Sequence, residues 1–120
     1  MGSSQAPRRS AIGDFIQVLT TTDRHEDATR IARELVERRL AGCVQVLGPI
    51  TSTYRWEGAV ETAQEWLCLV KSTRERYDEL EGAIRELHPY DVPEILAVPV
   101  VAGHAPYLAW LEEGVSGRGD

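Results

Sequence analysis

A seven-residue link, His88-Pro89-Tyr90-Asp91-Val92-Pro93-Glu94, gathers an imidazole, a phenol and two carboxylates in one short stretch of the chain. His88 closes an apolar helical pattern. Pro89 cannot continue that helix, because it has no N–H and its ring crowds the preceding turn. Pro93 favours extended backbone at the residue before it. The link therefore predicts a polar cluster at a helix C-terminus, immediately before a strand.

Hydrophobic periodicity predicts the elements that position this cluster. Alternation of apolar and polar residues, or a short apolar run, indicates a strand, and apolar residues spaced three and four apart indicate an amphipathic helix. Gly42 is expected to cap the first helix, and Gly48-Pro49 to interrupt the second strand. The predicted strands are 14–21, 43–56, 59–72 and 94–101, and the predicted helices are 23–41, 77–87 and a short one from Pro106 to Leu111.

The order of these elements is β-α-β-β-α-β followed by an extra helix. This order fits the split-βαβ, ferredoxin-like arrangement of the α+β class, in which an antiparallel sheet carries two helices on one face. At 120 residues the chain is expected to hold one domain, over residues 14–113. Residues 1–13 and 114–120 are rich in small and polar residues, and we expect them to be flexible tails.

Composition excludes several classes of partner. The net charge is −6, and the part between the tails is more acidic still, so a nucleic-acid partner is not expected. No apolar run is long enough for a transmembrane helix, and no apolar segment follows the N-terminal arginines as in a signal peptide. We therefore expect a cytoplasmic protein without a membrane partner.

Enzymatic chemistry has little support in the sequence. No Ser or Cys lies in a nucleophile-elbow motif, and no glycine-rich phosphate loop is present. Cys43 and Cys68 lie in apolar strand patterns without metal-ligand spacing, which is typical of buried structural thiols. We therefore expect a protein that is not an enzyme.

One strand pattern predicts self-association. A sheet covered by helices on one face should alternate apolar and polar residues, yet Trp66-Leu67-Cys68-Leu69-Val70 is apolar on both faces. The predicted helices can cover only one of these faces. A second copy of the chain is the simplest cover for the other.

Several motifs in a fixed order resemble the CutA family, small cytosolic proteins named for divalent-cation tolerance. The resemblance spans residues 15–111, essentially the whole predicted domain. The motifs that carry it are Leu40-Ala41-Gly42-Cys43-Val44, Thr51-Ser52-Thr53-Tyr54-Arg55-Trp56-Glu57-Gly58, Glu65 and Lys71, His88-Pro89-Tyr90 with Pro93-Glu94, and Tyr107-Leu108-Ala109-Trp110-Leu111.

The resemblance implies a homotrimer in which the long second and third strands extend sheets between subunits, an architecture similar to the PII signalling trimers. The resemblance also implies copper as a candidate ligand. In some bacterial members the proposed ligands are a cysteine near the end of the first strand and two adjacent histidines before Pro-Tyr. Here the corresponding residues are Thr20 or a neighbouring threonine, and Leu87 before His88. A single imidazole implies at most weak binding of copper or another divalent cation.

The same resemblance brings polar and aromatic residues from several elements toward subunit boundaries. Such a set could line a pocket for a small anionic ligand, or it could supply anchors and ion pairs of the trimer interface. Lys71 is the only lysine beside twelve arginines. We expect its ammonium in a partly buried polar pocket near a subunit boundary, paired with a carboxylate such as Glu65 or available to an anionic ligand; the alternative is a solvent-exposed lysine. The set is Tyr54, Trp56, Glu65, Lys71, His88, Tyr90, Glu94, Tyr107 and Trp110.

Two functions of different classes follow from these observations. The first is a non-enzymatic homotrimer that acts in divalent metal-ion tolerance, as the family resemblance implies. The second is a PII-like sensor that binds an anionic metabolite between subunits and signals to a protein partner.

Overall fold

The computed structural model describes residues 14–116, with the strands and α-helices in the predicted order and one 3-10 turn that was not predicted. Strand and helix types follow the sequence periodicity throughout this part of the chain. The elements are β1 (Phe15–Thr22), α1 (His25–Glu37), β2 (Cys43–Trp56), β3 (Ala59–Thr73), the 3-10 turn η3 (Arg74–Arg76), α2 (Tyr77–Leu87), β4 (Leu96–Pro99) and α3 (Ala105–Gly114).

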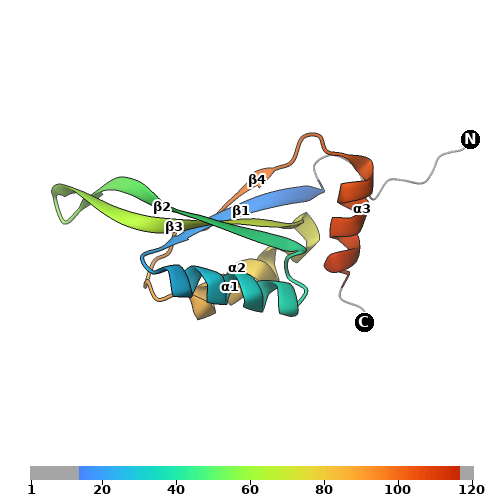
Figure 1. The fold of residues 1–120 in the computed structure, drawn as a ribbon, viewed down its shortest axis with the longest axis horizontal. Helices are drawn as coiled ribbons and strands as arrows, with labels where there is room; N and C mark the ends of the chain where they lie inside the picture. The colour runs from blue at the N-terminus through green and yellow to red at the C-terminus, as the bar shows by residue number, and fades with distance from the viewer. Residues whose placement is uncertain (1–13, 117–120) are drawn as a thin grey trace, which may run out of the picture.

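The four strands form one antiparallel sheet in the order β2-β3-β1-β4. Helices α1 and α2 lie side by side on one face of this sheet, and α3 lies across one end of it (Figure 1). This is the predicted ferredoxin-like α+β arrangement with an extra C-terminal helix. No helix within residues 14–116 is long and apolar enough to cross a membrane.

The main core lies between the sheet and the α1–α2 layer. Alternate residues of β1 and β3 point into it, which the period of a strand requires, and the apolar stripes of both helices meet them. Its fully buried members include Val18, Ile31, Leu35, Val70 and Ile84. Burial of these side chains holds the two layers together.

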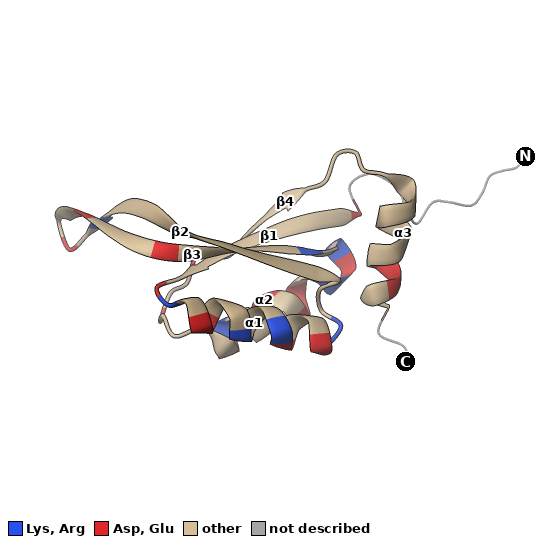
Figure 2. Cartoon of the chain, viewed as in Figure 1, with Lys and Arg blue, Asp and Glu red and all other residues tan. Residues whose placement is uncertain are grey.

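The opposite face of the sheet has no covering layer within the described residues. Cross-strand register places Leu96, Leu19, Leu69 and Gln45 in one row on this face, and Val98, Gln17, Lys71 and Cys43 in the next. We call it the open face. Figure 2 shows that charged residues gather on the helices, whereas most of the sheet carries none.

The open face is exposed at apolar positions. Leu47, Leu96 and Val98 keep 44%, 58% and 43% of their surface in contact with solvent, and Leu67 and Leu69 are half-buried. The strand Trp66–Val70 is therefore apolar on both sides, as predicted, and this chain covers only the side that meets the helices.

The β2–β3 hairpin continues far beyond the rest of the sheet. β1 pairs with β3 only as far as the Thr22–Trp66 pair, and we call the hairpin beyond it, residues 50–65, the arm. The register shifts between Leu47 and Ile50, at the predicted Gly48-Pro49 interruption. The arm projects away from the helices (Figure 1) and gives the chain its longest extent, 59 Å.

The predicted end of the first helix was wrong. α1 ends at Glu37, and the left-handed residue that turns the chain is Arg39, with φ 59°, not Gly42. Gly42 is needed instead for close packing, because a Cβ there would lie 2.5 Å from Cδ1 of Leu111. That contact, with Phe15 and Leu108, seats α3 on the end of the sheet.

Two predicted boundaries also differ from the structure. The last strand covers only Leu96–Pro99, not 94–101, because its ladder partner β1 pairs with it only from Ile16 to Leu19; one further bond, from Val100 N–H to Phe15 O at 2.9 Å, follows the strand. At the C-terminus, α3 continues through Gly114, and Val115 is buried, so the folded part extends beyond residue 113. The predicted N-terminal tail, and residues 117–120 of the other, lie outside the described residues.

Candidate functional site

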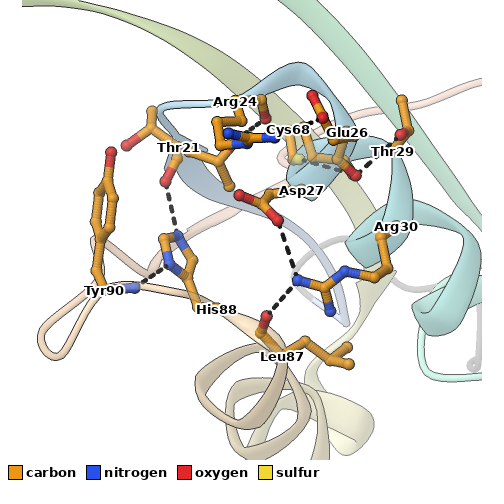
Figure 3. Close-up of polar contacts among 12 residues, drawn as sticks. Thr21, Arg24, Glu26, Asp27, Thr29, Arg30, Cys68, Leu87, His88 and Tyr90 are labelled. Carbon is orange, nitrogen blue, oxygen red and sulfur yellow. Dashed lines mark hydrogen bonds and ion pairs between the residues drawn. The ribbon is translucent and has the colours of Figure 1, made fainter.

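His88 and Tyr90 lie together, as the sequence predicted, but the carboxylate of their cluster comes from Glu65, whereas Asp91 and Glu94 are exposed. The backbone N–H of His88 donates to Ile84 O at 2.8 Å, and its ring is buried, with 7% exposed surface. Nε2 lies 2.7 Å from the carbonyl oxygen of Thr21, and Nδ1 lies 3.1 Å from the backbone nitrogen of Tyr90. Both ring nitrogens are therefore engaged by backbone groups (Figure 3).

These partners determine the tautomer of the ring. The Thr21 carbonyl can only accept a hydrogen bond, so Nε2 must carry a proton and donate it. The Tyr90 N–H can only donate, so Nδ1 must offer its lone pair. The geometry assigns His88 as the neutral imidazole protonated at Nε2.

The end of α2 is anchored just before His88. The last carbonyls of a helix lack intrahelical partners. Here Nη2 of Arg30 in α1 donates to the carbonyl oxygen of Leu87 at 3.0 Å, and it also lies 3.2 Å from a carboxylate oxygen of Asp27 (Figure 3). Pro89 then prevents further helix, and His88 takes extended backbone with ψ 139°. The loop after α2 thus leaves the helix in a fixed direction.

Tyr90 connects this loop to the root of the arm, which is the position of Glu65 in β3. Its ring lies 4.7 Å from that of His88, centre to centre, and its hydroxyl donates to Oε2 of Glu65 at 2.7 Å. The other carboxylate oxygen, Oε1, accepts a 2.8 Å hydrogen bond from Ser52. Glu65 is the first residue of β3 beyond the last β1 pair, so Tyr90 contacts β3 where β1 ends.

The phenol is held in its donating form. Burial and the hydrogen bond to Glu65 raise the pKa of Tyr90 well above its ordinary value. A tyrosine hydroxyl that stays protonated donates continuously to the carboxylate. The group of Ser52, Glu65 and Tyr90 is therefore a stable hydrogen-bonded bridge between β2, β3 and the loop after α2.

The residues present do not fit a copper site. Both nitrogens of His88 are already hydrogen-bonded, and Thr20, Thr21 and Thr22 offer no soft ligand nearby. Within residues 14–116 no group of three His, Cys, Asp or Glu side chains lies close enough together to hold a metal ion. The predicted weak site at His88 thus lacks a free ligand atom.

The second predicted feature, Lys71, lies on the open face with a different partner from the one expected. Its ammonium donates to Oε1 of Gln45 at 2.6 Å, whereas Glu65 is engaged by Ser52 and Tyr90. Strand register places Lys71 opposite Cys43 on one side and Gln17 on the other. Within residues 14–116, half-buried Lys71 forms no ion pair, and its hydrogen-bond partner and strand neighbours are neutral.

The remaining predicted site residues lie apart from His88. Tyr107 and Trp110 stack on α3, with ring centres 5.6 Å apart, and burial raises the pKa of Tyr107, with Cys43 close to its hydroxyl. Tyr54 and Trp56 lie exposed on the arm, and Glu94 is exposed before β4. Within residues 14–116, the hydrogen bonds and ring contacts around His88 join only Glu65 and Tyr90 from the predicted set, and Tyr54 lies close enough to Tyr90 to help raise its pKa.

Sequence reasoning missed three partners of this cluster. The Thr21 carbonyl has no side-chain signature, and the bond from Arg30 to Leu87 depends on how α1 and α2 pack. Ser52 reaches Glu65 only because the interruption at Gly48-Pro49 sets the register of the hairpin. The prediction of two buried thiols holds for Cys68, whose thiol pKa is raised by burial to about 11. It does not hold for Cys43, which is half-buried on the open face.

Comparison with known proteins agrees with this geometry. The CutA1 divalent ion tolerance protein family matches residues 16–114. The divalent-cation tolerance protein CutA of Thermus thermophilus is 48% identical over 96 residues, which cover 80% of this chain and 93% of that protein. Protein CutA of Mus musculus is 38% identical over 110 residues, 89% of this chain, but the match spans only 62% of the mouse protein.

Solved structures show the same fold. The crystal structure of CutA from Xylella fastidiosa has a TM-score of 0.83 and 37% sequence identity, and the match covers 85% of this chain and 98% of that one. Family, relatives and fold therefore agree over nearly all the described residues. The chain belongs to the CutA1 divalent ion tolerance protein family.

Proposed function

We propose that this protein acts as a non-enzymatic homotrimer in divalent metal-ion tolerance, with assembly as the basis of its function. The observation that carries the proposal is the open face. It exposes Leu47, Leu96 and Val98, whereas the opposite face of the same part of the sheet packs against α1 and α2. An apolar sheet face left in water is unfavourable at about 25 cal/mol per Å², so a second copy is the natural cover.

The unpaired strand edges indicate how two copies can pair. The arm part of β3 is paired with β2 on one side only, and β4 is paired only with β1. Their outer edges therefore hold N–H and C=O groups without ladder partners in the described chain. Pairing of one copy's arm with another copy's edge is a head-to-tail contact, and such contacts generate a closed ring when the rotation between copies closes. The resemblance to CutA sets the expected number at three.

The proposal is tested by measuring oligomeric state and metal tolerance for the same pair of proteins. Wild type and Leu96→Glu, which places a carboxylate on the open face, are expressed in a host strain that lacks its own relative. Growth is then measured across a series of copper, zinc and cobalt salt concentrations. We expect wild type to restore tolerance and the variant to fail at equal protein level. A variant that is monomeric by light scattering yet fully protective would contradict the proposal.

A PII-like sensor is the second candidate, and Lys71 is the observation that favours it. Its ammonium is balanced by no carboxylate within ion-pair distance in the described chain, on a face that the proposed assembly covers. A buried cation requires a partner, and an anionic metabolite at the subunit boundary would supply one.

Thermal-shift screening separates the two candidates. The trimer is heated with nucleotides, with di- and tricarboxylates, and with divalent metal salts, and the same series is repeated with Lys71→Arg. A sensor should gain stability from one anion class, and the variant should lose that gain while keeping its mass. Stabilisation by no anion, or equal stabilisation of both proteins, would eliminate Lys71 as the sensing group.

A further inference from the structure

We propose that His88 and Tyr90 form a brace that fixes the direction of the arm, with His88 as a positioning residue rather than a metal ligand. The inference rests on the proposed role of the arm in assembly and adds the means by which one chain presents that arm. The brace runs from the end of β1, through His88 and Tyr90, to Glu65 and Ser52.

The arm needs such a brace because the sheet does not support its root. Up to Trp66, β3 is held by hydrogen bonds to β1 on one side and β2 on the other. From Glu65 outward only β2 remains, and a two-stranded ribbon alone twists and bends easily. Tyr90 reaches β3 at Glu65, the first unsupported residue, and so takes over from β1 there.

His88 determines where Tyr90 lies. Nε2–H donates to Thr21, next to the last residue of β1, and the lone pair on Nδ1 accepts the N–H of Tyr90 two residues ahead. One neutral ring thus ties the loop after α2 to the end of β1 and turns Tyr90 toward the arm. Serine, lysine or arginine cannot replace it, because the position requires a donor and an acceptor at opposite corners of one planar ring.

The same two bonds exclude metal binding at His88. Coordination at Nδ1 would release the Tyr90 N–H, and coordination at Nε2 would displace the donor to Thr21. A metal would therefore have to break the brace before binding. We infer that any response of this protein to divalent ions does not begin at His88.

Imidazole nitrogen NMR on the ¹⁵N-labelled protein tests the tautomer directly. Two-bond correlations near neutral pH should show His88 as neutral with its proton on Nε2, and titration with Cu²⁺ should broaden the signals of exposed His25 and His104 first. A charged ring, a proton on Nδ1, or earliest broadening at His88 would overturn the assignment.

Amide hydrogen exchange tests the brace itself. Tyr90→Phe removes only the hydroxyl. His88→Gln keeps an amide donor that can reach the position of Nε2, but it has no acceptor at the position of Nδ1. His88→Asn keeps an acceptor at the position of Nδ1, but its side chain is too short to reach the position of Nε2. Tyr77→Phe on α2, on the helix side of the sheet, is the matched control. One lost hydrogen bond should speed exchange about tenfold. We expect this faster exchange at the root of the arm in Tyr90→Phe and at the Tyr90 amide in His88→Gln. The exchange rate of the Tyr90 amide should change little in His88→Asn, and the control should change neither rate.

Failure of the brace can be told apart from failure of the proposed assembly. If wild type proves monomeric, the assembly proposal fails, whereas the tautomer and exchange results still report on the brace. If wild type is a trimer, Tyr90→Phe should raise the protein concentration at half-dissociation at least tenfold, and Tyr77→Phe should not raise it. Unchanged arm exchange and unchanged assembly in Tyr90→Phe would refute the brace.

Discussion

Replacement of Leu96 by glutamate is expected to dissociate the assembly without unfolding the subunit. Leu96 keeps 58% of its surface exposed, so the single chain gains little from it. Covering that exposed part, roughly 100 Å², is worth about 2–3 kcal/mol at about 25 cal/mol per Å². A carboxylate in the same contact adds the cost of removing a charge from water.

A symmetric ring repeats this loss at every subunit. For three equivalent sites, the apolar loss alone lowers the association constant by about 10⁵-fold, since about 1.4 kcal/mol corresponds to a factor of ten. Light scattering at micromolar concentration reports the mass, and far-ultraviolet circular dichroism reports the fold. Val92→Glu is the matched control, because Val92 is 89% exposed in the loop before β4 and outside the open face.

The refuting result is specific. If Leu96→Glu has the wild-type mass and a wild-type dissociation midpoint, the open face is not the contact, whatever the number of subunits. If Val92→Glu dissociates equally, a general effect of added negative charge explains both variants. Only loss of assembly in the first and its retention in the second agrees with the reasoning.

Three further outcomes are expected. Thr20→Val should stabilise the fold by about 1 kcal/mol in chemical denaturation, because the buried hydroxyl of Thr20 has no hydrogen-bond partner among residues 14–116; a destabilised variant would reveal a missed partner. Gly42→Ala should destabilise by about 1–3 kcal/mol, since the new Cβ would lie 2.5 Å from Leu111, and an unchanged melting temperature would show that α3 shifts freely. Copper should bind no tighter than about micromolar in calorimetry, and equally in His88→Ala; a nanomolar site lost in that variant would contradict the hydrogen-bonded ring.

The sequence predicted the fold well because the relevant signals are local. Apolar spacing in α1 and α2, the long runs of β2 and β3, and the Gly48-Pro49 interruption each depend on residues close together in the chain. The two-sided apolar strand at Trp66–Val70 was equally readable, because the period of a strand assigns each side chain to a face.

The errors arose where tertiary contacts override local preference. Gly42 carries the sequence signal of a helix cap, but close packing against Leu111 is what requires glycine there. Lys71 and Glu65 lie on one strand with compatible charges, yet Tyr90, from a distant loop, takes the carboxylate and Gln45 takes the ammonium. The sequence placed His88 beside Tyr90, but it assigned the carboxylates of the cluster to Asp91 and Glu94 instead of Glu65, and the two backbone partners of His88 have no sequence signal.

The measurement that tests the central claim most directly is the mass of the native protein in solution. Light scattering coupled to size-exclusion chromatography should give about three times the 13.4 kDa of one chain, unchanged on dilution through the micromolar range. A stable, well-folded species with the mass of a single chain would leave the open face in water and would contradict the account.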